Sequence, residues 1–291
     1  MANLKEIRSR ITSVNSTRQI TAAMKMVSAA KLRRAQDAIT QMRPYAEKLQ
    51  EILQNLSSAL DVSENPYAEE REVKTILIVT VTSNRGLCGA FNNNVIKQAK
   101  SIIAEHPGAR MKVLSIGKKS FDAFKKTDYV CGTGYPSEPY KIYDDLNFTD
   151  SSTIASIIMD KFAAGKIDKV YLVYNSFKNA AVQILNTEQF LPIVPPEASE
   201  TSTSQIDYIF EPGKEEIVEE LIPKSLKTQF YKAILDSHAG EHGARMTAMH
   251  KATDNATDML KDLKLTYNKA RQASITNEIL EIVAGAEALN G

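Results

Sequence analysis

Apolar and small residues return every three or four positions along the last quarter of the chain, and this spacing predicts one long helix over residues 224–288. No proline interrupts that stretch. At 1.5 Å per residue the helix would be about 90–100 Å long, whereas a compact chain of this size has a radius of gyration of about 19 Å. The helix is therefore expected to project. The stripe that would face a single partner helix consists of Met246, Met249, Thr253, Ala256, Leu260, Leu263, Tyr267 and Ala270.

Beyond residue 270 the apolar face widens to about half of the helix circumference, counted at 100° per residue. One partner helix cannot cover a face of that width. This end is expected either to insert into another molecule or to curl onto its own domain. Because the helix is expected to project, insertion into a protein-lined socket on another molecule is favoured. The apolar positions are Ile275, Ile279, Leu280, Ile282, Val283, Ala286 and Leu289.

A second long helix is predicted near the N-terminus, over about residues 3–60. Pro44 is expected to kink or interrupt it, because proline removes an interior hydrogen bond and clashes with the preceding turn. This helix runs toward the middle of the chain and the C-terminal helix runs away from it, so the two are predicted to pair as an antiparallel coiled coil. Its predicted stripe starts at Leu4, Ile7, Ile11 and Val14 and continues, rotated, at Ile20, Met24 and Val27.

In the middle of the chain the pattern of apolar residues changes from a helical period to that of β-strands. Residues 75–82 form a near-continuous β-branched run, which is typical of a strand buried on both faces of a parallel sheet. Strands and helices then alternate, which predicts an α/β fold, Rossmann-like in its central domain. The further strands are expected at 111–116, 169–174 and, at an edge, 182–190, and the helices at 91–104, near Phe121 and at 151–164. The predicted domains are an N-terminal helix over 1–65, the α/β domain over 66–210 and a C-terminal helix over 211–291.

Composition and charge narrow the classes of protein that fit this pattern. The chain has 291 residues, of which 43% are hydrophobic and 24% charged, as in an ordinary soluble protein. No apolar run approaches the roughly 18 residues of a membrane-spanning helix, and a charged amphipathic segment stands where a signal peptide would begin. Cys88 and Cys131 are too few for a disulfide scaffold and are expected to be buried thiols. The net charge is +1, yet the first 36 residues carry eight Lys and Arg against Glu6 alone, so one arm is strongly basic.

Residues 84–92, Asn-Arg-Gly-Leu-Cys-Gly-Ala-Phe-Asn, lie between a predicted buried strand and a predicted helix. An α/β fold binds phosphate at this place, on the N-terminus of a helix. The stretch lacks the Gly-Lys-Ser/Thr ending of a P-loop and the spacing of a dinucleotide fingerprint. A glycine turn that lets the helix and strand pack closely is the favoured interpretation, and a nucleotide site is the alternative.

His238-Ala-Gly-Glu-His242 matches the H-x-x-E-H pattern of inverted zinc proteases. Such a site also needs a third ligand and a concave pocket. The motif instead lies on a helix that is expected to project, beside two glycines that weaken it, Gly240 and Gly243. Two solvated histidines are therefore the favoured interpretation.

The basic N-terminal arm suggests contact with nucleic acid phosphates. However, its first 44 residues contain no aromatic side chain to stack on bases, and its charges are scattered around the helix. A solvated face or an acidic protein partner is favoured over nucleic acid. Because no catalytic set of residues stands out, three classes remain: a non-enzymatic shaft, an α/β nucleotide-binding enzyme, and a coiled-coil scaffold or nucleic-acid-binding protein.

Six stretches of the sequence resemble the gamma subunit of F-type ATP synthases, and they cover both arms and the central domain in the expected order. The resemblance is carried by residues 20–36, 84–92, 244–249, 252–256, 267–276 and 281–289. It implies a rotor: a coiled coil that turns inside the hexamer of alpha and beta subunits and couples ion flow through the membrane ring to ATP synthesis or hydrolysis. It implies no catalytic residue, cofactor or metal in this chain, because the catalysis belongs to the partners.

The resemblance also implies which residues contact those partners. Met24 and Lys25 match the region that faces an acidic loop of beta, which would give the basic arm its partner. The foot on the membrane c-ring corresponds to Tyr208 and Glu211. The upper region near the catalytic loops corresponds to Arg271, Gln272, Thr276 and Glu278, and the tip in an apolar bearing to the segment that contains Ile279, Ile282 and Leu289.

The implied partners are the alpha and beta subunits, an epsilon subunit and the c-ring, with one copy of the chain per complex, no nucleic acid and no membrane span. The implied location is the cytoplasmic side of a bacterial plasma membrane, since neither the chloroplast cysteine insert nor a transit peptide is visible. The sequence departs from the family in two places. Asn84 stands where aspartate is usual, and Gly240 and Gly243 stand where serine and alanine are more frequent.

Overall fold

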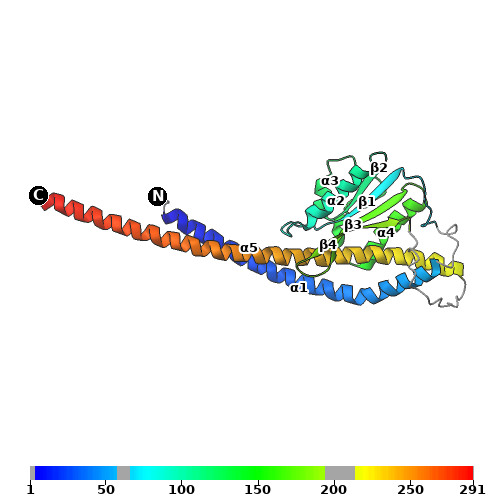
Figure 1. Ribbon diagram of the computed structural model, residues 1–291, viewed down its shortest axis with the longest axis horizontal. Coiled ribbons are helices and arrows are strands. Elements are labelled where there is room, and N and C mark those ends of the chain that lie inside the picture. Colours follow the sequence, from blue (N-terminus) through cyan, green and yellow to red (C-terminus); the bar gives the residue numbers. More distant parts are fainter. Residues whose placement is uncertain (1–3, 58–65, 194–213, 291) are drawn as a thin grey trace. The chain divides into compact units, whose positions relative to one another are not determined.

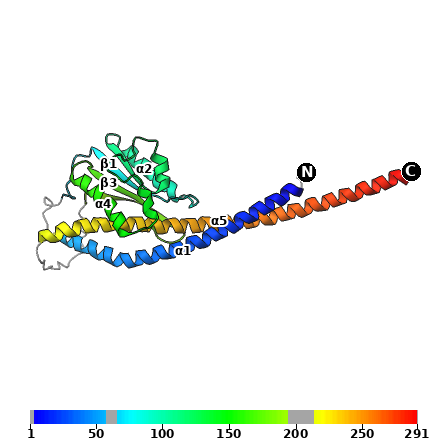
Figure 2. The same ribbon diagram turned by 180° about the vertical axis from the view of Figure 1, so that it is seen from behind.

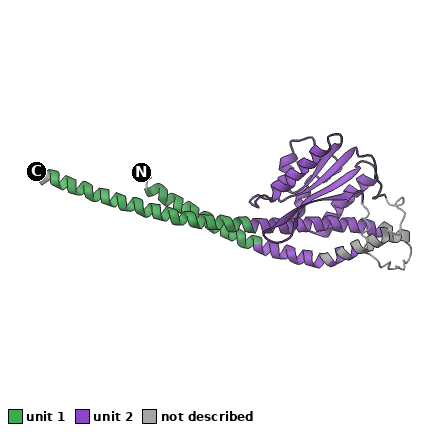
Figure 3. Ribbon diagram, viewed as in Figure 1, with its two compact units in different colours: residues 1–28, 246–291 green, residues 29–245 purple. Residues whose placement is uncertain are grey.

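The computed structural model describes residues 4–57, 66–193 and 214–290 (Figure 1). The chain divides into two compact units, which are described separately (Figure 3). The first unit comprises residues 1–28 and 246–291, and the second comprises residues 29–245. The elements are α1 (Leu4–Ser57), β1 (Thr75–Val81), α2 (Phe91–Glu105), β2 (Arg110–Ile116), α3 (Lys118–Phe124), the short 3-10 helix η2 (Pro139–Tyr143), α4 (Phe148–Ala163), β3 (Lys169–Phe177), β4 (Gln183–Leu191) and α5 (Lys214–Asn290).

The first unit consists of the start of α1 and the second half of α5, which run side by side (Figure 2). Hydrogen bonds across the pair link Thr21 to Thr253 and Lys25 to His250, so residue numbers rise along one helix as they fall along the other. The predicted antiparallel pairing is therefore confirmed. All eight predicted stripe positions of α5, from Met246 to Ala270, are buried or half-buried, while most residues between them are exposed.

The predicted stripe on α1 is correct at its start and wrong after Val14. Ile20 and Val27 are 59% and 57% exposed, and Met24 is half-buried. The buried side continues instead in unbroken steps of three and four, as the period of 3.5 residues in a coiled coil requires. Polar residues occupy these positions, so following the apolar side chains led away from the seam. The buried and half-buried positions at these steps are Leu4, Ile7, Ile11, Val14, Arg18, Thr21, Lys25 and Ser28.

The last part of α5 has a different environment. Every side chain from residue 275 to residue 288 is exposed. The exposed positions include the apolar face predicted from the sequence, with Ile279 at 54% and Ile282 at 71%. No described segment of the first unit covers this face.

The second unit is built on a four-stranded sheet of order β2-β1-β3-β4. Strand β1 is parallel to both β2 and β3, with Ile76 paired to Met111 on one side and to Lys169 on the other. The last strand, β4, is antiparallel to β3 and lies at an edge of the sheet. The predicted α/β fold with an edge strand near residues 182–190 is confirmed.

Alternate residues of β1 face two different cores, which explains its continuous apolar sequence. Leu77 and Val79 belong to one cluster with α4 and the sheet-packed part of α5, including Ile158 and Phe230. Ile76 and Ile78 belong to a second cluster, with α2 and α3 on the opposite face of the sheet. Both faces of the sheet are therefore covered by helices, as parallel sheets require.

The prolines do not interrupt the long helices. Pro44 lies inside a continuous α1, between the buried side chains of Ile39 and Leu49, so an interruption there is not found. Pro223 lies inside α5, which begins ten residues before the predicted start at residue 224. Ile222 and Leu226 on either side of it are buried in the first cluster, and this packing offsets the lost hydrogen bond.

Candidate functional site

The loop between β1 and α2 is closed by its own side chains. The Asn92 side-chain carbonyl accepts hydrogen bonds from the backbone N–H of Ser83 at 2.9 Å and from its hydroxyl at 3.0 Å. Leu87 and Gly89 adopt positive φ angles of 65° and 60°, which complete the turn. From α5, the Arg245 guanidinium donates to the carbonyls of Arg85 and Gly86. The observed contacts are those of a packed turn tied to α5. The close packing of helix and strand that the sequence analysis attributed to these glycines is not found, because a Cβ would meet nothing within 4 Å at Gly89 and only the Lys119 side chain, at 3.8 Å, at Gly86.

Asn84, where a departure from the family pattern was expected from the sequence, uses both ends of its amide. Its oxygen accepts from the backbone N–H of Lys118 at 3.0 Å, and its nitrogen donates to the carbonyl of Tyr140 at 2.9 Å. An aspartate carboxylate has no N–H and accepts hydrogen bonds only. The asparagine therefore supplies a hydrogen bond to the segment around η2 that an ionised aspartate cannot make.

The prediction of two solvated histidines at His238 and His242 is wrong. His242 is buried and His238 is half-buried, with their Nε2 atoms 3.2 Å apart and the His238 ring stacked on Tyr143. Burial lowers the pKa of His238 to about 4 and the pKa of His242 to about 3, so both rings are neutral at pH 7. Sequence reasoning placed the motif on a projecting part of the helix, whereas this part of α5 packs on the domain.

The glutamate of the same motif pairs with an arginine one turn later. Glu241 Oε1 lies 2.5 Å from Arg245 Nη1, and both side chains are about nine-tenths buried. Burial raises the pKa of Glu241, and the charge and hydrogen bond of Arg245 oppose that rise. Within residues 4–57, 66–193 and 214–290, no three His, Cys, Asp or Glu side chains are grouped to hold a metal ion. The observed partner of this glutamate is thus a cation of its own helix.

At Gly240 and Gly243, α5 lies close to the hairpin of β3 and β4. A Cβ at Gly240 would lie 3.3 Å from a ring carbon of Phe91 and 3.4 Å from the carbonyl oxygen of Asn175. At Gly243 it would lie 3.2 Å from the carbonyl oxygen of Ala180. These contacts are tighter than ordinary van der Waals distances, so the two glycines allow a backbone approach that serine or alanine would push apart.

In the first unit, polar side chains cross the coiled coil near Lys25. Its ammonium lies 3.3 Å from Nδ1 of His250, which lies 3.4 Å from a carboxylate oxygen of Asp254. One turn away the Thr253 hydroxyl donates to the hydroxyl of Thr21 at 2.9 Å. Sequence reasoning singled out Met24 and Lys25 and placed Thr253 in the seam of α5, but it missed Thr21 and His250. An unbroken count of the 3.5-residue period through the polar positions of α1 would have found Thr21.

The predicted contact residues fall into separate groups. Met24 and Lys25 lie together on α1, both half-buried. Near the end of α5, the four predicted polar contacts and two of the apolar ones are exposed: Arg271, Gln272, Thr276, Glu278, Ile279 and Ile282. Leu289 lies on the same helix, but its side chain is outside the described part, as are Tyr208 and Glu211 altogether.

Two further predictions concern the cysteines and membrane-spanning helices. Cys88 is buried, as predicted, and Cys131 is half-buried. No helix in the described ranges is both long enough and apolar enough to span a membrane.

Comparisons with known proteins agree with the resemblance seen in the sequence. A family model described as ATP synthase matches residues 3–289. The ATP synthase gamma chain of Flavobacterium johnsoniae is 63% identical over 292 residues, and that of Cytophaga hutchinsonii is 56% identical over 298 residues, each covering 100% of both chains. A chain of the rotor of Euglena gracilis mitochondrial ATP synthase has the same fold, with a TM-score of 0.63, 20% identity, and coverage of 94% of this chain and 98% of that one. The chain belongs to the ATP synthase gamma-chain family.

Proposed function

We propose that this chain is the central shaft of a rotary ATP synthase. It would couple ion flow through a membrane ring to ATP synthesis or hydrolysis on a hexamer of alpha and beta subunits. The observation that carries the proposal is the end of α5, where a helix of this family exposes apolar side chains such as Ile279 and Ile282. An exposed apolar face of this width marks a surface that another protein covers. The chain is the non-catalytic subunit, and ATP chemistry belongs to the hexamer.

The partners proposed for this chain follow from that role. They are the alpha and beta subunits around the coiled coil, an epsilon subunit and the c-ring, with one shaft per complex. A related structure is described as the central stalk and c-ring of the Tetrahymena thermophila enzyme, and this supports the same assembly here. The chain would be a peripheral protein on the cytoplasmic side of a bacterial plasma membrane, and its relatives with 56–63% identity are bacterial.

The contact residues are proposed as groups. Met24 and Lys25 would meet an acidic loop of beta, and Arg271 to Glu278 would meet the loops near the catalytic sites. Ile279 to Leu289 would turn in an apolar bearing, and Tyr208 with Glu211 would stand on the ring. Met26 and Val27, in the same turn of α1, are 67% and 57% exposed, and these outward apolar side chains support a protein contact at this level of the helix. The proposed domain boundaries of the chain are 1–65, 66–210 and 211–291.

A reversible cross-link tests whether the shaft turns. In the assembled complex, a disulfide from Met24→Cys to one beta subunit must stop ATP turnover, and reduction must restore it, because the link opposes motion between subunits. The matched control links Thr21→Cys to Thr253→Cys, whose native hydroxyls lie 2.9 Å apart. This link joins parts that turn together, so turnover should continue.

Two results would refute the proposal. One is ATP turnover that survives complete linking to beta. The other is ATP hydrolysis by the purified full chain alone, which would favour the nucleotide-binding enzyme instead.

A further inference from the structure

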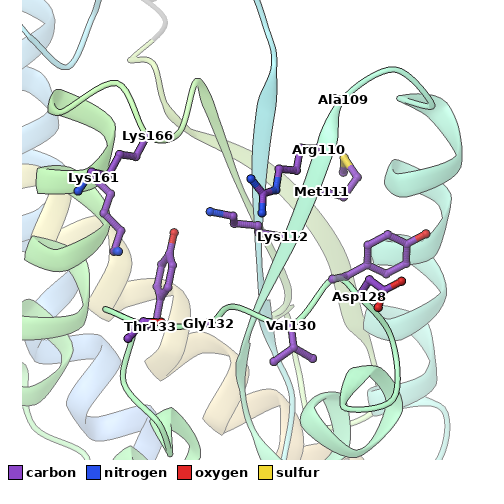
Figure 4. A pocket seen from close by; sticks show the side chains of 12 residues that line it. Ala109, Arg110, Met111, Lys112, Asp128, Val130, Gly132, Thr133, Lys161 and Lys166 are labelled. Carbon is purple, nitrogen blue, oxygen red and sulfur yellow. The ribbon is translucent and has the colours of Figure 1, made fainter.

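A cavity of about 770 Å³ opens beside the edge strand β2 (Figure 4). Its walls come from β2, from the segment that follows α3, and from α4 with the turn after it. Cavities of roughly 300–1,000 Å³ are typical of small-molecule sites. The lining residues are Ala109, Arg110, Met111, Lys112, Asp128, Tyr129, Val130, Gly132, Thr133, Tyr135, Lys161 and Lys166.

The charge of this cavity is strongly unbalanced. Four cations line it, and Asp128 is the one acid among the lining residues. Lys112 from β2 and Lys161 from α4 extend their side chains into the same space (Figure 4). Across the described ranges, no carboxylate forms a salt bridge with either lysine, whereas other lysines of the chain, such as Lys125 and Lys141, have acidic partners. Four positive charges therefore converge here against a single lining carboxylate.

Tyr135 adds a hydrogen-bond donor that has no acceptor. Its hydroxyl is buried and has no hydrogen-bond partner in the described part of the chain. Burial raises the pKa of Tyr135, so the hydroxyl keeps its proton. Buried polar groups normally have partners, and each exception calls for an explanation such as a bound ion.

The backbone beside Tyr135 makes room for the Lys161 ammonium. Gly134 has a φ of 84°, and a Cβ at this position would lie 2.8 Å from Lys161 Nζ. The same ammonium lies 4.2 Å from the centre of the Tyr135 ring. A side chain at residue 134 would therefore displace this cation from its place against the ring.

We propose that this cavity binds a small phosphate-bearing anion. Arg110, Lys112 and Lys161 would neutralise its charge, and the Tyr135 hydroxyl would donate to one of its oxygens. A phosphate has several acceptor oxygens and carries two charges near neutral pH, so it satisfies the unpaired cations and the unpaired donor together. The inference does not depend on the rotor function, because every residue that carries it belongs to the second unit.

Titration calorimetry of the full chain with pyrophosphate tests the site. Lys112→Met and Lys161→Met keep the aliphatic stems and remove one charge each, and together they should weaken binding at least tenfold. Tyr135→Phe should weaken it a few-fold. The matched control is Lys97→Met, which removes the same charge from an exposed position on α2 and should leave the affinity unchanged. Inorganic phosphate and AMP in parallel titrations distinguish a free phosphate site from one for a phosphorylated metabolite.

Several results would overturn the proposal. One is the absence of pyrophosphate binding by the native chain at millimolar concentration. Another is an equal loss of affinity in Lys97→Met and the two cavity variants, since the binding would then be non-specific attraction to a basic surface. Circular dichroism melts of each variant separate lost binding from lost folding. If the lysine variants prove unstable, Arg110→Met, which removes one lining charge from an exposed position, provides the second test and should weaken binding several-fold.

Discussion

Helix α5 has wide apolar faces in two regions, and they have opposite environments. Between residues 226 and 245 the face packs on the sheet, and Phe230 and Ile234 are almost completely buried. Between residues 275 and 288 a face of similar width is exposed throughout. The stretch between them has a narrow seam, which one helix covers. The width of an apolar face thus indicates how many neighbours a helix needs, but not whether its own chain provides them.

The largest effect is expected in the seam between these two regions. Replacing Leu260 and Leu263 together by aspartate places two charges without partners against α1. The cost is on the order of 5 kcal/mol, enough to separate the two helices. Loss of helical signal and failure to assemble with the hexamer would be the measured outcome. Met259→Asp with Leu265→Asp is the matched control, since these positions are 52% and 61% exposed. Unchanged melting of the Leu260 and Leu263 variant would mean that the register is wrong.

Much of the fold was predictable because apolar spacing reflects burial directly. The α5 seam and the α/β alternation followed from it. The seam of α1 did not, because Thr21 and Ser28 occupy buried positions while Ile20 and Val27 face outward. In a shaft that must also meet partners, apolar residues on the outside are not a packing signal. The exposed end of α5 was identified because its face is too wide for one helix.

The buried histidine pair was missed for a different reason. Nothing in the sequence of His238 and His242 distinguishes a helix that packs on a sheet from one that projects. The available signal of packing was the pair of glycines, of which Gly240 lies between the two histidines and Gly243 directly after them. Two glycines three residues apart lie on one helix face and allow another backbone to approach closely. The cavity next to β2 had no sequence signal at all, because its cations come from separate elements that only the fold brings together.

The second-largest effect is expected when one apolar side chain is truncated in each of the two wide faces of α5. Phe230→Ala removes a ring that is 1% exposed and should lower the free energy of unfolding by about 3–5 kcal/mol. Ile282→Ala, at a position 71% exposed, should change it by less than about 0.5 kcal/mol in the isolated chain. Denaturant unfolding measures both. Ile282→Ala should instead weaken association with the hexamer, and a large loss of stability in the free chain would show that the end of α5 is covered by its own protein.

A third prediction concerns pH and the buried histidines. Because their pKa values in the folded state lie at about 4 and about 3, the unfolded chain binds more protons between those values and about 6.5. The contribution of the two neutral histidines to the free energy of unfolding is complete above pH 6.5. It is lost as the pH falls toward 4, at up to about 1.4 kcal/mol per pH unit for each ring. The neighbouring charges are Lys31, Arg245 and Glu241, and the raised pKa of Glu241 opposes part of this loss.

The difference between two proteins isolates the histidines from the other carboxyl groups. Unfolding of the native chain and of the His238→Gln, His242→Gln variant should be followed from pH 7 to pH 4. We expect the free energy of unfolding of the native chain to fall more steeply than that of the variant, by up to about 1.4 kcal/mol per pH unit for each ring. Parallel pH profiles would mean that the histidines titrate normally and are accessible to water.

The smallest effect is expected for the polar contact inside the narrow seam, between Thr21 and Thr253. Thr253→Val keeps the shape and removes the hydroxyl, which costs about 1 kcal/mol because the Thr21 hydroxyl still has the Arg18 carbonyl as an acceptor. A double-mutant cycle with Thr21→Val should give a coupling energy of about 0.5–1 kcal/mol. Thr266→Val is the control, since that exposed hydroxyl donates to the Asp262 carbonyl of its own helix.

A buried polar pair of this kind adds little stability, but it favours one axial alignment of two helices over a slip by one turn. Cysteines at Ile11 and Leu263, which the Thr21 and Thr253 register places opposite each other, should therefore form a disulfide in the native background and form it less uniquely once both threonines are valine. If the disulfide yield is unchanged while the coupling energy is zero, the apolar positions alone set the register.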